Sequence, residues 1–276
     1  MVGAGCRYDM NVVHAEYATT HAVLIPSFNT GARLFQTVAA IRLLGYPVWV
    51  VIDGSTDGTG DVLSRIAASD PDLHAIVLPR NQGKGAAILH ALRLARAEGI
   101  THVVTVDADG QHCSDDIAAF IAASLRNPSA MVLGIPIFDD SAPPIRVAGH
   151  RVGNVLANLV TLRSGIGNSL FGFRVYPVAS LLQVFNETRW MRRFDFDSEA
   201  AIRLSWRGVP AINLPTPVRY FRPEDGGVSH FKYLRDNLLL AFMYARLFAG
   251  LVRRLPVLLT QRRRSPRVDH DRRTAG

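Results

Sequence analysis

The sequence is poor in the features that mark secreted, disulfide-bonded or membrane-spanning proteins. It has two cysteines, Cys6 and Cys113, among 276 residues, which excludes a disulfide framework and the paired cysteines of a zinc site. No stretch has the roughly 20 apolar residues that a transmembrane helix needs. The expected N-terminal tail, residues 1–20, lacks the apolar core of a signal peptide. We therefore expect a protein of the reducing cytoplasm.

The net positive charge of the body of the chain is small. The formal net charge is +8, and residues 251–276 alone contain eight arginines and two aspartates. The rest of the chain therefore carries a charge of only +2, which argues against a nucleic-acid groove across the body. A terminal arginine cluster suits an anionic surface, which is either a membrane or a nucleic acid. We expect a membrane surface and no nucleic-acid partner.

Short apolar segments alternate with helical patterns over the first half of the chain. The expected strands are residues 22–26, 48–53, 75–78, 103–106 and 131–135, and the expected helices are residues 32–44, 61–69, 86–98 and 117–125. This alternation predicts an α/β protein with a Rossmann-like, mainly parallel sheet and helices on both faces. In such sheets, ligands bind beyond the carboxyl ends of the strands.

The fourth expected strand ends in two acidic residues, Asp107 and Asp109, followed by Gln111 and His112. Alternate side chains of a strand point the same way, so the two carboxylates lie on one side and repel each other. Mg²⁺ or Mn²⁺ with oxygen ligands would neutralise them. The alternative is an ordinary polar turn after a strand, because aspartate and glycine are common turn residues.

Three other polar loops also follow expected strands, namely residues 27–29, 53–57 and 81–85. The carboxyl ends of parallel strands meet at one edge of a sheet. We therefore expect these loops and the acidic segment to line a single site.

In this order and spacing, the loops resemble glycosyltransferase family 2, which has the GT-A fold. The matching segments are residues 25–29, 51–59, 81–85, 107–112 and 172–174. The nearest subgroup is the polyprenyl- or dolichyl-phosphate sugar transferases. Residues 206–210, 217–220 and 227–231 are also similar to bacterial transferases of aryl-polyene pathways. The resemblance predicts a GT-A domain over residues 21–230.

The resemblance implies a metal-dependent, inverting glycosyltransferase. Its donor is a UDP- or GDP-linked sugar, and its acceptor is lipid-linked or lies close to the inner face of the cell membrane. The implied metal ligands for Mg²⁺ or Mn²⁺ are Asp107, Asp109 and Gln111, with Asp109 also catalytic. The implied donor-binding residues are Pro26, Ser27, Asn29, Asp53, Ser55, Gly83, Lys84, Asp107, Arg219 and Ser229. Lys84 would reach the diphosphate, and the helix that follows it presents backbone N–H groups to an anion.

The chain departs from the family pattern at three positions. Ile52 replaces the first acid of the usual Asp-Asp-Gly-Ser loop, so only Asp53 can fill that role. Phe171 stands where Ser or Cys is usual, and Asn168 stands where an acid is common. The last two changes concern the acceptor side more than the donor side.

A hydroxyl acceptor requires a general base, and the candidates are Asp195, Asp197 and Glu199. Asp197 and Glu199 best match the acidic position that opens the acceptor-side helix of the family. The alternative is capping, because acids in the first turn of a helix are favourable without catalysis. A lipid-phosphate acceptor would need no strong base, because its oxygen is already anionic. Arg174 is a candidate phosphate ligand, with a solvated surface position as the alternative.

Residues 231–260 are apolar almost all round and contain several arginines, which predicts an amphipathic helix. Three placements remain open: against the body, in a homodimer, or in the bilayer interface with arginines at the headgroups. Residues 261–276 are expected to form a basic, disordered tail.

Two rival functions also fit parts of the sequence. An Asp-x-Asp-Gly segment after an apolar strand occurs in phosphohydrolases, with Asp107 as the nucleophile. Those enzymes place the segment on an early strand, whereas here it follows the fourth. The loss of an acid at Ile52 points instead to a non-catalytic module that binds a membrane or a partner.

Overall fold

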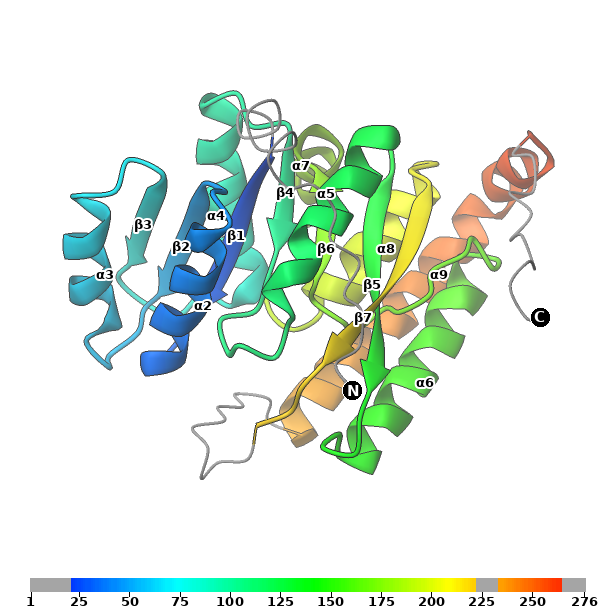
Figure 1. The fold of residues 1–276 in the computed structure, drawn as a ribbon. Helices are drawn as coiled ribbons and strands as arrows, with labels where there is room; N and C mark the ends of the chain where they lie inside the picture. Colours follow the sequence, from blue (N-terminus) through cyan, green and yellow to red (C-terminus); the bar gives the residue numbers. More distant parts are fainter. Residues whose placement is uncertain (1–20, 222–232, 265–276) are drawn as a thin grey trace, which may run out of the picture.

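The computed structural model describes residues 21–221 and 233–264. Over these residues the chain forms a seven-stranded sheet in the order β3-β2-β1-β4-β6-β5-β7 (Figure 1). The strands are β1 (His21–Ser27), β2 (Val48–Asp53), β3 (Leu73–Leu78), β4 (His102–Thr105), β5 (Met131–Phe138), β6 (Arg174–Pro177) and β7 (Ala211–Val218). The predicted N-terminal tail and most of the predicted basic tail lie outside the described residues.

The sheet is mainly parallel, as predicted. β1 pairs in parallel with β2 and β4, β2 with β3, and β5 with β7. β6 runs antiparallel between β4 and β5. This short strand was not expected from the sequence. It brings the segment around Gly172 against the end of β4.

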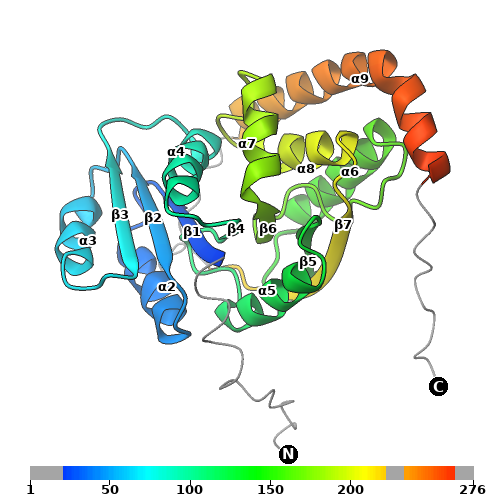
Figure 2. The same cartoon turned by 90° about the horizontal axis from the view of Figure 1, so that it is seen from above.

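Helices cover both faces of the sheet (Figure 2). They are α2 (Ala32–Leu43), α3 (Thr59–Ala67), α4 (Lys84–Ala97), α5 (Ile117–Arg126), α6 (Pro144–Val160), α7 (Val178–Glu187), α8 (Phe196–Trp206) and α9 (Tyr233–Arg264), with a 3₁₀ turn at Ser114–Asp116. Residues of α2, α3 and α5 share one core with Val23 and Ile25. Residues of α4, α7 and α8 share the other with Leu24. The alternation along β1 follows from the two-residue period of a strand.

The predicted C-terminal helix is present as α9, which packs against α6 and α8. Its inner face buries Met243 and Leu247 in the core, and Tyr244 Oη donates a hydrogen bond to Gly153 O at 2.9 Å. Its outer face leaves large apolar side chains such as Phe242 and Val252 exposed. In the described part of the chain, every helix is too short or too polar to cross a bilayer.

Candidate active site

A cavity of about 1070 Å³ lies beyond the carboxyl ends of β1, β2 and β4. All four polar loops reach it. They contribute Ser27 at the end of β1, Asp53 at the end of β2, Lys84 at the start of α4, and Asp107 and Asp109 after β4. α6, α8 and α9 complete its walls. The loops therefore meet at the expected edge of the sheet and line one cavity there.

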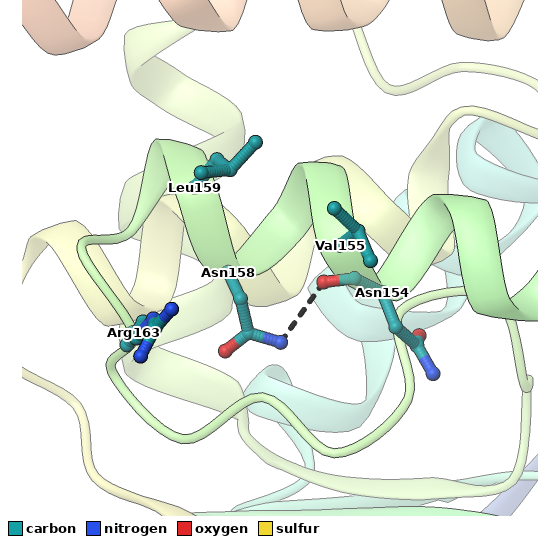
Figure 3. A pocket seen from close by; sticks show the side chains of 5 residues that line it. All are labelled: Asn154, Val155, Asn158, Leu159 and Arg163. Carbon is teal, nitrogen blue, oxygen red and sulfur yellow. Dashed lines mark hydrogen bonds between the residues drawn. The ribbon is translucent and has the colours of Figure 1, made fainter.

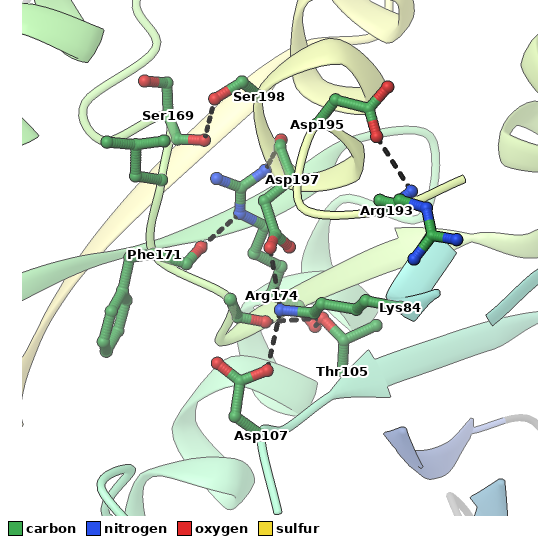
Figure 4. Close-up of polar contacts among 12 residues, drawn as sticks. Lys84, Thr105, Asp107, Ser169, Phe171, Arg174, Arg193, Asp195, Asp197 and Ser198 are labelled. Carbon is green, nitrogen blue, oxygen red and sulfur yellow. Dashed lines mark hydrogen bonds and ion pairs between the residues drawn. The ribbon is translucent and has the colours of Figure 1, made fainter. Parts of the chain in front are cut away.

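Lys84 lines this cavity and lies between two carboxylates (Figure 4). Its Nζ is 2.7 Å from Asp107 Oδ1 and 2.7 Å from Asp197 Oδ2. Burial lowers the pKa of Lys84, but the two acids outweigh burial and raise it overall. Burial likewise raises the pKa of Asp107, and the charge of Lys84 reverses this and lowers it. Lys84 and Asp107 are therefore held in their charged forms.

Asp109 carries negative charge that no neighbour fully balances. Burial, followed by the charge of Asp107, raises the pKa of Asp109 to about 6. The N–H of Gln111 donates to Asp109 Oδ1 at 3.1 Å and offsets only part of this. A cation beside Asp109 would favour the ionised form and lower this pKa again.

The residues present fit a divalent metal that shares its coordination with substrate. The described residues contain no cluster of three or more His, Cys, Asp or Glu side chains able to hold a metal by themselves. Mg²⁺ and Mn²⁺ are commonly held by one or two carboxylates together with substrate phosphates. Asp107 and Asp109 supply those carboxylates, and Gln111 lines the cavity beside them.

His112 and Phe171 fix the orientation of Asp107. The N–H of Asp107 donates to His112 Nδ1 at 3.2 Å, so Nε2 carries the proton and faces Asp107 Oδ2 at 3.5 Å. The imidazole stacks on Phe173 at 5.4 Å and meets the edge of Phe171 at 4.7 Å. Burial lowers the pKa of His112, which favours the neutral ring. The unexpected Phe171 therefore packs behind the acidic segment.

Two close approaches of the backbone depend on glycine. A Cβ added at Gly172 would lie 2.6 Å from both Asp107 Oδ2 and Lys84 Nζ. A Cβ added at Gly85 would lie 1.9 Å from Met191 O. Since real Cβ atoms do not approach other atoms this closely, any side chain at either position would displace the ion pairs of Lys84 or the first turn of α4.

Asp53 organises the loop that carries Lys84. Its carboxylate is buried and accepts hydrogen bonds from the N–H groups of Gln82 at 2.8 Å and Gly83 at 2.7 Å. Asp53 also lines the cavity, where it can reach a ligand. Its contact with a nucleotide stays a prediction.

Some predicted donor-binding residues lie apart from the cavity lining. Asn29 and Ser55 join two loops to each other: the N–H of Asn29 donates to Ser55 Oγ at 3.0 Å, and Asn29 Oδ1 accepts the N–H of Thr56 at 2.7 Å. Arg219 is exposed, and its side chain lies 5.7 Å from the ring of Phe221. Ser229 lies outside the described residues.

Of the three candidate bases, Asp197 reaches the cavity. Its second oxygen, Oδ1, is buried and has no hydrogen-bond partner among the described residues. Glu199 is fully buried and turned away, with its oxygens paired to Arg203 and Arg246. Asp195 accepts N–H groups from the preceding turn, including that of Arg193 at 2.9 Å. The structure therefore does not bring Glu199 to the predicted catalytic position.

Arg174 is a structural residue, so its interpretation as a phosphate ligand was wrong. The side chain is fully buried. It donates to Phe171 O at 2.6 Å, to Tyr176 Oη at 2.8 Å, and to the backbone carbonyl of Asp197. These bonds tie the segment before β6 to the first turn of α8, and so position Asp197.

The sequence motifs did not indicate the part of the cavity formed by α6 and α9. There Arg146 and Arg235 line it together with several apolar side chains. The positive charge of Arg146 acts to lower the pKa of Asp109 against the effect of burial. The regular spacing of Ile145, Val152 and Leu156, which lie along α6, was the available signal.

A second, smaller hollow of about 240 Å³ lies on another face of α6 (Figure 3). It is lined by Asn154, Val155, Asn158, Leu159 and Arg163. Asn158 Nδ2 donates to the carbonyl of Asn154 at 2.9 Å. Because no acid or histidine lines this hollow, it offers none of the groups for acid–base or metal chemistry that the larger cavity has.

Comparison with known proteins identifies the family. The family model described as glycosyl transferase family 2 matches residues 22–185, which is more than half of the chain. The chain belongs to glycosyltransferase family 2. It is therefore a glycosyltransferase, and the seven-stranded sheet with its flanking helices is the GT-A fold of the predicted family.

Curated relatives match over most of the chain. A polyprenol monophosphomannose synthase of Mycolicibacterium smegmatis is 31% identical over 68% of this chain and 71% of its own. A UDP-N-acetylglucosamine–dolichyl-phosphate N-acetylglucosaminyltransferase of Methanococcus voltae is 27% identical over 65% of this chain and 78% of its own. These relatives agree with the predicted polyprenyl-phosphate sugar transferase type.

Among solved structures, glucosyl-3-phosphoglycerate synthase from Mycobacterium tuberculosis, crystallised with Mn²⁺ and UDP-glucose, has the same fold. Its TM-score is 0.59, with 18% sequence identity over 91% of this chain and 84% of its own. At this identity the similarity extends to the fold alone.

Proposed function

We propose that this glycosyltransferase moves a sugar from a UDP- or GDP-linked donor to a lipid-phosphate acceptor, with Mg²⁺ or Mn²⁺. The observation that carries the proposal is the meeting of Lys84 with Asp107 and Asp197, beside the under-neutralised Asp109, in one large cavity. The names of the two curated relatives support a lipid-phosphate acceptor.

The diphosphate of the donor would lie against the start of α4. This helix begins at Lys84, so the positive end of its dipole and the ammonium group act at the same place. Lys84 is one of only two lysines among 31 basic residues. Its compact charge can exchange a carboxylate partner for a phosphate oxygen while remaining buried.

Asp107 and Asp109, with the amide of Gln111, would hold the metal ion. When bound, the metal neutralises charge on the departing nucleoside diphosphate. Asp107 is pre-oriented for this by the N–H that it donates to His112 and by the charge of Lys84.

Asp197 would act according to the chemistry of the acceptor. The oxygen of a lipid phosphate is already anionic and needs no base, so Asp197 would hold Lys84 in place. For a hydroxyl acceptor, its unpartnered Oδ1 would accept the proton. We propose direct displacement with inversion at the anomeric carbon, as the family resemblance implies.

The outer face of α9 supports a peripheral position on the inner face of the cell membrane. Phe242, Phe248 and Val252 are exposed there, and an apolar face with nearby arginines suits a bilayer interface. A homodimer through the same face is the alternative, and the two are separated by whether binding requires anionic vesicles.

The direct test is donor binding followed by transfer. Purified protein should bind UDP or GDP more tightly with Mn²⁺ than without it, as measured by calorimetry. It should then transfer radiolabelled sugar from the matching donor to a polyprenyl phosphate. Asp109→Asn should abolish both effects, whereas Asp115→Asn removes the same charge from an exposed residue and should change neither. Failure of the wild type to bind either nucleotide with metal would refute the proposal.

A further inference from the structure

The catalytic cavity continues as an apolar groove between α6 and α9. Side chains of Ile145, Val152 and Leu156 on α6 and of Leu240 and Ala241 on α9 line it. We call these residues, together with Gly149, the α6–α9 groove. Both views of the fold draw α6 and α9 beside each other (Figures 1 and 2), and the hydrogen bond from Tyr244 to Gly153 O joins them.

The α6 wall of the groove is a continuous helical stripe. Ile145, Gly149, Val152 and Leu156 follow one another at intervals of four, three and four residues, which places them on one face. A Cβ added at Gly149 meets no described atom within 4 Å. The stripe therefore leaves open space above Gly149 that a ligand can enter.

The stripe exposes apolar surface beside the reacting groups. Ile145 is 63% exposed and Val152 is 60% exposed. Apolar surface at the mouth of a site marks binding of an apolar group. Neither the nucleotide nor the sugar of the donor is apolar, so the groove does not suit the donor.

Positive charge lies where the groove meets the catalytic residues. Arg146 adjoins Ile145 in the chain, lines the cavity, and its charge acts on Asp109. Arg235 lines the opposite wall, with its Nε 2.9 Å from Asp236 Oδ1. An occupant with an anionic head and an apolar tail matches this order of charge and apolar surface.

We propose that the α6–α9 groove holds the first hydrocarbon units of a lipid-phosphate acceptor, and that Arg146 contacts its phosphate. The proposal rests on the proposed function. It adds the site of the lipid chain, the direction in which the lipid lies, and the residue that recognises its head.

The test is direct binding of farnesyl phosphate, measured by calorimetry below its micellar concentration. Gly149→Trp fills the groove, whereas Val155→Trp puts the same ring on another face of α6. Gly149→Trp should weaken farnesyl phosphate binding at least about tenfold and leave the affinity for UDP or GDP with Mn²⁺ unchanged. Val155→Trp should leave both affinities unchanged.

The head of the ligand is tested with Arg146→Gln and with farnesol. The variant should lose about tenfold in affinity for farnesyl phosphate and keep its affinity for farnesol, which has no charge. Equal losses for both ligands would overturn the assignment of Arg146.

The possible outcomes distinguish failure of the proposed lipid site from failure of the proposed function. If the wild type and Gly149→Trp bind farnesyl phosphate with equal affinity, the α6–α9 groove is not the lipid site, even if sugar transfer occurs. A wild type that binds farnesyl phosphate in the groove but transfers no sugar to it would contradict the proposed function alone. If Gly149→Trp instead abolishes a concentration-dependent dimer in sedimentation and does not affect the lipid, the occupant is a second copy and the proposal is wrong.

Discussion

Glu199 and Arg246, 47 positions apart, form a buried ion pair that joins α8 to α9. Arg246 Nη1 is 3.1 Å from Glu199 Oε1, and Nη2 is 2.9 Å from Oε2. The guanidinium also lies 4.2 Å from the ring of Trp190. Since Asp197 precedes Glu199 by two residues, the same turn of α8 holds α9 on one side and reaches the active site on the other.

Arg246→Met should lower the free energy of unfolding by about 3 kcal/mol, because it leaves a fully buried carboxylate with fewer partners. Arg203 continues to pair with Glu199. The expected loss is therefore at the lower end of the range for breaking a buried ion pair. Urea denaturation measures it. The control is Arg207→Met, whose pair with Glu187 is 30% and 42% exposed and should contribute less than about 1 kcal/mol. Equal effects of the two variants would contradict the role given to the buried pair.

Gly172→Ala should reduce the rate of sugar transfer on the order of 100-fold. The added Cβ would displace Asp107 and Lys84 from each other, and small misplacements of reacting groups have effects of this size. The added atom would lie 2.6 Å from each of them. Initial rates at saturating donor give the comparison. Gly60→Ala is the matched control, because the nearest atom to its added Cβ is at an ordinary 3.5 Å. Its rate should equal that of the wild type.

Lys84→Met should weaken binding of UDP or GDP about 10- to 100-fold, which corresponds to a charged hydrogen bond of about 1.5–3 kcal/mol. The change also removes the charge that lowers the pKa of Asp107, so Asp107 should bind a proton more readily. Calorimetric titration with nucleotide and Mn²⁺ tests the affinity. Arg96→Met removes one positive charge from the exposed far end of the same helix and should change the affinity little. A similar loss in both variants would mean that net charge, rather than the position of Lys84, governs binding.

The sequence was sufficient to predict β1, β2, β3, β4 and β5, because each is a short apolar run and a polar loop follows each of the first four. It did not predict β6, which pairs His102 with Pro177. That pairing joins segments far apart in the chain, so no local pattern records it.

The two acids at the start of α8 show the limit of local reasoning about the site. Successive residues of a helix are rotated by about 100°, so Asp197 and Glu199 cannot face the same cavity. Helix geometry therefore rules out a shared role for these two predicted bases, and the choice between them depends on where α4 and α9 pack. Lys84 from α4 meets Asp197, and Arg246 from α9 meets Glu199.

Acid should destabilise the protein through the buried histidine His21. Its ring stacks on His102 at 4.8 Å, and its Nε2 lies 3.1 Å from Ser124 Oγ. Burial, and then the charge of His102, lowers the pKa of His21 from 6.5 to about 4. Because the folded pKa is below the unfolded value, the contribution to stability is complete above pH 6.5 and is lost as the pH falls towards 4. The full loss is about 3 kcal/mol.

The double variant His21→Phe with Ser124→Ala removes the titrating ring together with its hydroxyl partner, so the buried Ser124 hydroxyl is not left without this bond. Urea denaturation at pH 7.5, 6.0 and 5.0 should give a smaller decline in stability than for the wild type. Part of the decline should remain, because burial also lowers the pKa of His102. The exposed His90 provides the control, and His90→Phe should follow the wild-type curve. If the double variant follows it as well, the buried ring of His21 does not determine the acid sensitivity of the fold.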